Sequence, residues 1–181
     1  MLTLVSSNEN KLHEFKRFGL PGLDIEKGVD LPEVDADGET VVLYKALAAG
    51  PHRIVEDTAL HIDGAQIGVN IRWLLDDIAN HDGKRATWEV WLGINDSQHI
   101  TTYRGEITGR ITAKYAASHQ GFGFDNYFIP DGTDKTLYEL EMDGRKDAFS
   151  ARKKAIDAFL ACDVQKRIPI PNIPQWNGPM Q

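Results

Sequence analysis

The spacing of apolar and polar residues in the first part of the chain predicts strand, helix, strand and helix in that order. Residues 2–6 form a short apolar run that is typical of a buried strand, and residues 8–18 carry apolar side chains at helical spacing. Residues 23–29 predict a second strand. A second helix is expected over residues 39–49, because Gly50-Pro51 is a common signal for a helix end.

The middle of the chain has the period of two that predicts strands. Short apolar stretches at residues 53–55 and 59–62 flank two carboxylates. Residues 86–94 and 99–107 alternate aromatic or aliphatic with polar side chains, and Asn95-Asp96 between them suits a hairpin turn. We therefore expect this region to be mainly β.

Three further elements and a tail complete the pattern. Apolar stripes predict helices over residues 71–79 and 148–161, and a strand is expected over residues 122–129. The closely spaced prolines of residues 166–181 exclude a continuing helix and predict an extended tail, which leaves residues 1–165 as one domain. The order of the elements fits an α/β fold around a mixed sheet.

Composition and charge narrow the possible partners. The 181 residues are 41% hydrophobic and 26% charged, as in ordinary globular proteins. The net charge of −7 repels the phosphate backbone of nucleic acid, so we expect no nucleic-acid partner. A small anion stays possible, because local cations outweigh a field that is screened beyond ~10 Å.

The cysteine content and the apolar runs bear on location. The chain has one cysteine, Cys162, which cannot form an internal disulfide and so gives no sign of secretion. The first residues lack a cationic leader, and no segment approaches the roughly 20 apolar residues of a membrane span. We expect a cytoplasmic protein without membrane contact.

The candidate chemistry centres on two adjacent carboxylates, Glu56 and Asp57, in a strand-like stretch. Side chains alternate along a strand, so one of the pair points to each face of the sheet. Burying two carboxylates is costly, so their presence in a strand indicates a function. Other polar clusters suit the same task. They comprise Ser7, Asn8, Lys11 and Glu14, then Glu33, then Lys146, Ser150 and Arg152. Carboxylates for a divalent cation with amines and hydroxyls for phosphate together predict a nucleotide site.

The first cluster lies where a strand turns into a helix. Backbone N–H groups and the positive helix end there suit a phosphate, and Lys11 adds a point charge. Taken alone, Ser7 and Asn8 are more typical of an ordinary helix cap. The companion motifs favour the phosphate site.

Five motifs in this order resemble the inosine triphosphate pyrophosphatase family over residues 2–160. They are Ser7-Asn8-Glu9-Asn10-Lys11 with Glu14, Asp30-Leu31-Pro32-Glu33, Val55-Glu56-Asp57-Thr58, Gly121-Phe122-Gly123-Phe124-Asp125, and Lys146 with Ser150-Ala151-Arg152. The resemblance implies an α/β fold with a central mixed, elongated, twisted sheet flanked by helices and two lobes around an active-site cleft. It also implies a homodimer and an enzyme that hydrolyses aberrant purine nucleoside triphosphates to monophosphate and pyrophosphate.

The resemblance assigns the phosphate chemistry to four residues. Glu33 would bind the essential Mg²⁺, and Asp57 would orient and deprotonate the attacking water. Glu56 would support the metal, and Lys11 would neutralise charge on the departing pyrophosphate. Mg²⁺ needs only one or two carboxylates when phosphate oxygens and water complete its shell.

The resemblance assigns the base and sugar to the second half of the chain. Phe122 and Phe124 would sandwich the purine, although a pair of aromatics two apart on a strand is, taken alone, more typical of a core. A further set would meet the base edge or sugar and complete the substrate site. These residues are Asp125, Lys146, Ser150 and Arg152.

Two departures from the family pattern leave the preferred base open. Ala151 stands where relatives carry histidine, which removes a hydrogen-bond donor near the base. Thr58-Ala59 replaces a common Ser-Gly and matters less. Two alternatives stay open: a Maf-type pyrophosphatase for pyrimidine or modified nucleotides, which Phe122, Phe124 and Lys146 argue against, and a nucleotide-binding module without turnover.

Overall fold

The computed structural model describes residues 1–65, 76–116 and 124–181. These residues divide into two compact units. The first comprises Met1–Thr58, Val90–Gly105 and Arg152–Gln181, and the second comprises the described parts of Ala59–Glu89 and Glu106–Ala151.

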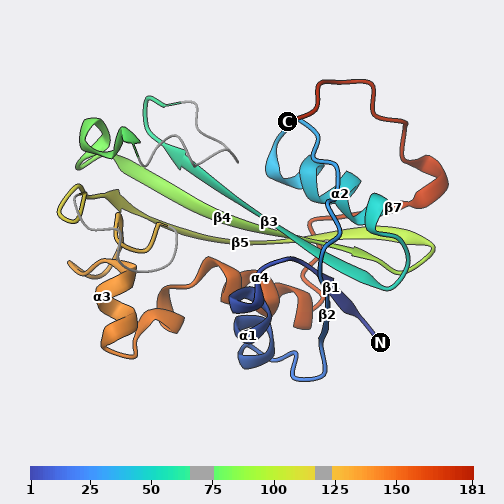
Figure 1. Ribbon diagram of the computed structural model, residues 1–181, viewed down its shortest axis with the longest axis horizontal. Helices are drawn as coiled ribbons and strands as arrows, with labels where there is room; N and C mark the ends of the chain where they lie inside the picture. The colour runs from blue at the N-terminus through green and yellow to red at the C-terminus, as the bar shows by residue number, and fades with distance from the viewer. Residues whose placement is uncertain (66–75, 117–123) are drawn as a thin grey trace. The chain divides into compact units, whose positions relative to one another are not determined.

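The strands of the described chain form one mixed seven-stranded sheet (Figure 1). They are β1 (Thr3–Val5), β2 (Asp24–Glu26), β3 (Arg53–Ile62), β4 (Arg85–Asn95), β5 (His99–Ile111), β6 (Phe128–Pro130) and β7 (Lys166–Pro169). The order is β2-β1-β3-β4-β5-β6, with β7 also paired to β5. β1 is parallel to β2 and β3, whereas β5 is antiparallel to β6 and β7, so the predicted α/β class with a mixed sheet is confirmed.

Helices α1, α2 and α3 begin where side chains satisfy free backbone N–H groups. The α-helices of the described chain are α1 (Glu9–Arg17), α2 (Gly38–Ala49), α3 (Leu137–Met142) and α4 (Ala151–Leu160). Asn8 caps α1 by accepting a hydrogen bond from the Asn10 amide, and Asp37 caps α2 in the same way. Thr136 and Glu139 form a capping box at α3.

In the first unit α2 packs directly on the sheet. Its buried residues join strand residues in one apolar cluster, made of Val5, Val42, Leu43, Ala46, Val55 and Ile100. Gly93 on β4 allows the close approach, because a Cβ there would lie 2.5 Å from the Val42 carbonyl oxygen. In Figure 1, α2 lies on one side of the strands, and α1 and α4 lie on the other.

The second unit has an aromatic core. The Trp88 ring on β4 meets Phe124 and Phe128 edge-on, with ring centroids 5.9 Å apart in both pairs. Phe124 also contacts the edge of Tyr127, at 6.3 Å between centroids. Edge-to-face contacts of this kind stabilise an apolar interior.

Several element boundaries differ from the sequence predictions. β3 runs without a break through both carboxylates. The strand expected over residues 122–129 is shorter, since residues 124–127 form a turn before β6 and residues 122–123 are outside the described chain. The helix expected over 71–79 falls mainly on undescribed residues, and Ile78–His81 form a 3-10 helix. No helix in the described ranges is long and apolar enough to cross a lipid bilayer.

Candidate active site

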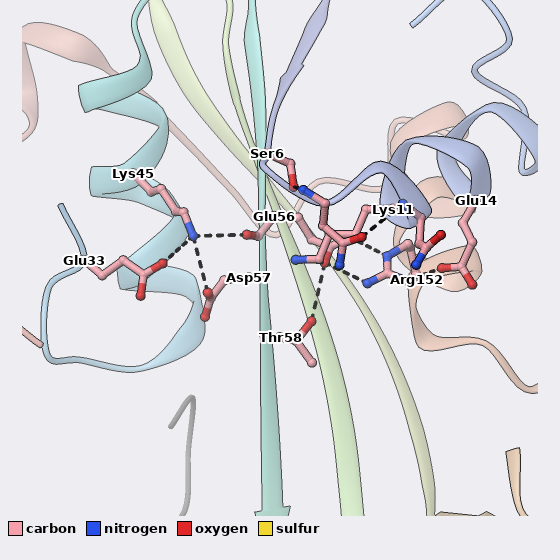
Figure 2. Close-up of polar contacts among 11 residues, drawn as sticks. Ser6, Lys11, Glu14, Glu33, Lys45, Glu56, Asp57, Thr58 and Arg152 are labelled. Carbon is pink, nitrogen blue, oxygen red and sulfur yellow. Dashed lines mark hydrogen bonds and ion pairs between the residues drawn. The ribbon is translucent and has the colours of Figure 1, made fainter. Parts of the chain in front are cut away.

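Strand β3 presents Glu56 and Asp57 to opposite faces of the sheet, as alternation along a strand requires. Figure 2 shows Glu56 directed toward α1 and α4, and Asp57 directed toward α2. Each carboxylate meets a different set of cations, so the two neighbours occupy different electrostatic environments.

Glu56 is a fully paired carboxylate. Arg152 of α4 donates two hydrogen bonds to it, from Nε at 2.5 Å and from a terminal nitrogen at 3.0 Å, and the Lys11 ammonium of α1 lies 3.1 Å away. Arg152 also binds Glu14 on α1. Burial alone would raise the pKa of Glu56, but the charges of Arg152 and Lys11 lower it to about 2. Glu56 is therefore ionised at any ordinary pH.

Asp57 is a mostly buried carboxylate, with 13% of its side chain exposed, and nearby cations compensate its charge less than that of Glu56. Among the described residues its nearest cation is the Lys45 ammonium of α2, 3.6 Å away, and that ammonium also lies 2.6 Å from Glu33. Burial raises the pKa of Asp57 to about 6; Lys45 opposes this shift and the negative charge of Glu33 adds to it. A carboxylate in this range can both accept and release a proton near neutral pH.

The oxygens on this face suit a hard divalent cation. Asp57 Oδ2 is buried and has no hydrogen-bond partner within the described parts of the chain, which is costly unless a ligand or water satisfies it. Glu33 faces the same Lys45 and is 38% exposed. No group of three or more His, Cys, Asp or Glu suited to a metal occurs among the described residues. Two carboxylates fit Mg²⁺ only together with phosphate oxygens and water.

The start of α1 lies beside the Glu56 network. Asn8 uses its side chain to cap the helix, while its own amide donates to Ser6 Oγ at 3.1 Å. Ser7 is exposed. The first-turn N–H groups and Lys11 form a positive end that suits an anion.

Most of the residues expected to meet the base lie in the second unit, whereas Arg152 lies in the first. Phe124 is 2% exposed within the aromatic core, and Asp125 is also buried. The Lys146 ammonium donates to Asp125 Oδ2 at 2.5 Å. Ser150 directly follows the 3-10 helix Lys146–Phe149. Phe122 lies outside the described residues, so its predicted stacking on the base stays a prediction, as does that of Phe124.

Sequence reasoning missed Lys45. The first unit brings together Lys11, Glu56 and Arg152 on one face and Glu33 with Asp57 on the other, and Lys45 joins the second group. One signal existed: Lys45 is a lone basic residue between apolar neighbours of α2. A lysine there that is only 14% exposed needs an anionic partner.

Comparisons with known proteins agree over most of the chain. The Ham1 family model matches residues 2–162. A dITP/XTP pyrophosphatase of Methanopyrus kandleri is 31% identical over 85% of this chain and 91% of the relative. Proteins of the same name from Deinococcus deserti and Leifsonia xyli are 31% and 32% identical, each over 88% of this chain and over 88% and 93% of their own lengths.

Proposed function

The chain belongs to the Ham1 family, and we propose that it hydrolyses dITP, ITP and XTP to nucleoside monophosphate and pyrophosphate. The membership confirms the resemblance that the sequence motifs indicated. Relatives named dITP/XTP pyrophosphatases, similar along nearly their whole length, support the substrate class. Such an enzyme removes aberrant purine nucleotides from the precursor pool.

The observation that carries the proposal is the unequal state of the two adjacent carboxylates. Glu56 is held by Lys11 and Arg152, whereas Asp57 has a raised pKa and a buried oxygen without a partner among the described residues. A general base works best when its pKa is near the operating pH. Asp57 therefore receives the proton of the attacking water, and Glu56 holds the phosphate-binding helix in place.

The remaining charged residues position the substrate. Lys11 and the first turn of α1 contact phosphate oxygens, and Lys45 keeps Glu33 beside Asp57. Catalysis of this kind consists mainly of alignment and charge neutralisation. Water aligned by Asp57 attacks the α-phosphorus, the bond to the bridging oxygen breaks, and pyrophosphate leaves.

Glu33 and Asp57 would hold Mg²⁺. Glu56, which the resemblance assigned as a supporting ligand, is directed to the other face of the sheet, where Lys11 and Arg152 pair with it. When bound, the ion would neutralise negative charge on the triphosphate. The Asp57 oxygen that lacks a partner in the described chain and the nearby Glu33 support this assignment. The Lys45 ammonium lies next to both carboxylates, which suits a site that must also be stable without the ion.

The base would be recognised by the second half of the chain. Asp125, Lys146, Ser150 and Arg152 would meet the base edge or sugar, and Phe122 would stack on the ring. Phe124 was predicted to stack as well, but it is 2% exposed and packs against Trp88 and Tyr127. Ala151 is 4% exposed and offers no polar side-chain atom, so discrimination would depend on the Asp125–Lys146 pair. The resemblance also implies a homodimer in the cytoplasm; light scattering would test the dimer.

A panel of triphosphates tests the function. The protein is incubated with Mg²⁺ and dITP, XTP, ATP, GTP or pyrimidine triphosphates, and pyrophosphate and phosphate are measured separately. Pyrophosphate from dITP and XTP supports the proposal. Turnover of pyrimidine triphosphates alone would indicate the Maf-type alternative, and binding without any release would indicate a module that has lost turnover.

A further inference from the structure

The residues after the family match make ordered contacts of their own. The match ends at residue 162, yet Lys166–Pro169 form β7 and pair with β5. Ile168, Ile170 and Ile173 then pack against the apolar cluster beneath α2. This part of the chain was expected to be an extended tail, and β7 and the 3-10 helix Ile170–Asn172 tie its first half to the sheet.

The following residues are anchored to α2. The Tyr44 hydroxyl donates to the Pro174 carbonyl oxygen at 2.8 Å, and the Tyr44 and Trp176 ring centroids are 5.3 Å apart. Tyr44 directly precedes Lys45, the residue that binds Glu33. Residues 174–181, here called the strap, are thus attached to the helix that carries one partner of this ion pair (Figure 1).

The strap is also anchored to the loop that carries Glu33. The Gln181 amide donates to the Glu33 carbonyl oxygen and its side-chain nitrogen donates to the Val34 carbonyl oxygen, both at 3.0 Å. On the other side, the Asp35 amide donates to Pro179 at 3.0 Å. Trp176 Nε1 donates to the same Pro179 carbonyl, which links the two anchors.

The loop has little regular structure to fix it otherwise. Residues 27–37 form neither helix nor strand, except for the single bridge between Val34 and Met180. Val34 is 3% exposed, so the loop is held by a buried side chain and by hydrogen bonds to the strap. Such outer contacts set the orientation of a metal ligand and commonly affect its affinity.

We propose that the strap is a positioning element that fixes Glu33 against α2 and so sets the geometry of the cation site. It clamps the two elements that carry Glu33 and Lys45, and it lies outside the part of the chain that the family model covers. This role rests on the proposed function, in which Glu33 binds Mg²⁺. The strap residues that bond to the loop, Pro179 and Gln181, are positioning residues, because they act through Glu33.

Two substitutions separate positioning from general structure. Gln181→Ala removes the side-chain bond to Val34, and Gln175→Ala alters an exposed glutamine of the same strap as the matched control. We expect Gln181→Ala to raise the Mg²⁺ concentration for half-maximal turnover by about 10-fold, with kcat at saturating Mg²⁺ little changed. Deletion of residues 175–181 should raise the Mg²⁺ concentration for half-maximal turnover by up to about 100-fold. Gln175→Ala should match the wild type.

Hydrogen exchange gives a readout that needs no turnover. The Asp35 amide, bonded to Pro179, should exchange much faster in the deletion variant and in Gly178→Ala, in which the new Cβ would lie 2.5 Å from the Trp176 ring. Gly178→Ala keeps the test available if the deletion does not fold. Wild-type exchange at Asp35 together with an unchanged Mg²⁺ requirement would overturn the proposal. If the wild type hydrolyses no triphosphate, the proposed function fails. The exchange comparison then still tests whether the strap holds the loop that carries Glu33.

Discussion

At the scale of single residues, Glu56 and Asp57 differ in pKa because the strand directs their side chains to opposite faces of the sheet. Among the described residues, Glu56 pairs with Arg152 and Lys11, whereas Asp57 pairs with Lys45 and is affected by the like charge of Glu33. The first arrangement stabilises an ionised acid, and the second keeps a proton acceptor near neutral pH. Removing the charge of Glu56 should therefore destabilise the fold, whereas removing the charge of Asp57 should stabilise it.

Asp57→Asn should abolish most turnover. An amide cannot accept the proton of the attacking water, so kcat should fall by about 10²–10⁴-fold. Nucleotide binding should persist, because Lys11 and the start of α1 are unchanged. Steady-state kinetics with dITP and a binding titration check both parts, and an active Asp57→Asn variant would remove Asp57 from the role of base.

The same variant should be more stable than the wild type at neutral pH without metal. The pKa of Asp57 is raised from 3.8 to about 6, so its contribution to stability is complete below about pH 4 and is lost as the pH rises through about 6. Asparagine avoids that loss, which amounts to at most about 3 kcal/mol. Urea unfolding should show the gain at pH 7 and little difference at pH 4. An Asp57→Asn variant that is less stable than the wild type at pH 7 would contradict the claim that ionised Asp57 destabilises the fold.

Glu56→Gln should have the reverse effect. The pKa of Glu56 is lowered from 4.5 to about 2, so its contribution is present above about pH 4.5 and is lost as the pH falls toward 2. The variant should lose about 3 kcal/mol at pH 7.

Arg152→Met should cost about 3–5 kcal/mol, because it leaves Glu56 buried with fewer cations. Urea unfolding measures both, and neutral effects would show that this network is dispensable.

The sequence predicted most of these residues but not their pairings. Glu56 and Asp57 stood out because strand interiors rarely hold two carboxylates, and strand periodicity predicted their opposite faces. That Arg152 would reach Glu56 could not be read from the chain, since 96 positions separate the two. Lys45 was missed because a single lysine in a helix is usually solvated.

At the scale of elements, local signals located the ends of α1 and α2 better than the ends of several strands. Asn8 and Gly50 delimit α1 and α2 as predicted, because caps depend on nearby residues. The capping box of α3 was present in the sequence at Thr136 and Glu139 but was not used. Strand lengths depend on distant partners, which explains why β6 is shorter than expected and why β7 was not predicted.

The contact between α2 and β4 should be sensitive to one methyl group. Gly93→Ala would place a Cβ 2.5 Å from the Val42 carbonyl oxygen and 3.1 Å from the Ala46 Cβ, so α2 would have to move. We expect a loss of about 1–3 kcal/mol and lower activity, because α2 carries Lys45. Gly22→Ala, where a Cβ meets nothing within 4 Å, is the matched control. Equal unfolding midpoints for the two variants would contradict this packing.

At the scale of the whole molecule, the net charge and the local charge at the candidate site favour different kinds of ligand. A net charge of −7 disfavours polyanions, yet Lys11 and the start of α1 place positive charge where a triphosphate would bind. Composition alone could exclude partners but could not identify a substrate. The order of the motifs along the chain did that, and the family match supports it.

Removal of divalent cations should stop turnover without unfolding the protein. In the proposal, Glu33 and Asp57 would supply oxygens for one ion, and Lys45 pairs with both carboxylates without it. Chelation should therefore abolish pyrophosphate release while circular dichroism stays unchanged, and added Mg²⁺ should restore activity. Full activity in the presence of chelator would rule out the cation site.

The most direct test is hydrolysis of dITP in water labelled with ¹⁸O. If Asp57 activates water for attack at the α-phosphorus, the label enters dIMP, the pyrophosphate stays unlabelled, and Asp57→Asn forms neither product at an appreciable rate. Label in the pyrophosphate, or release of phosphate with dIDP, would contradict the account.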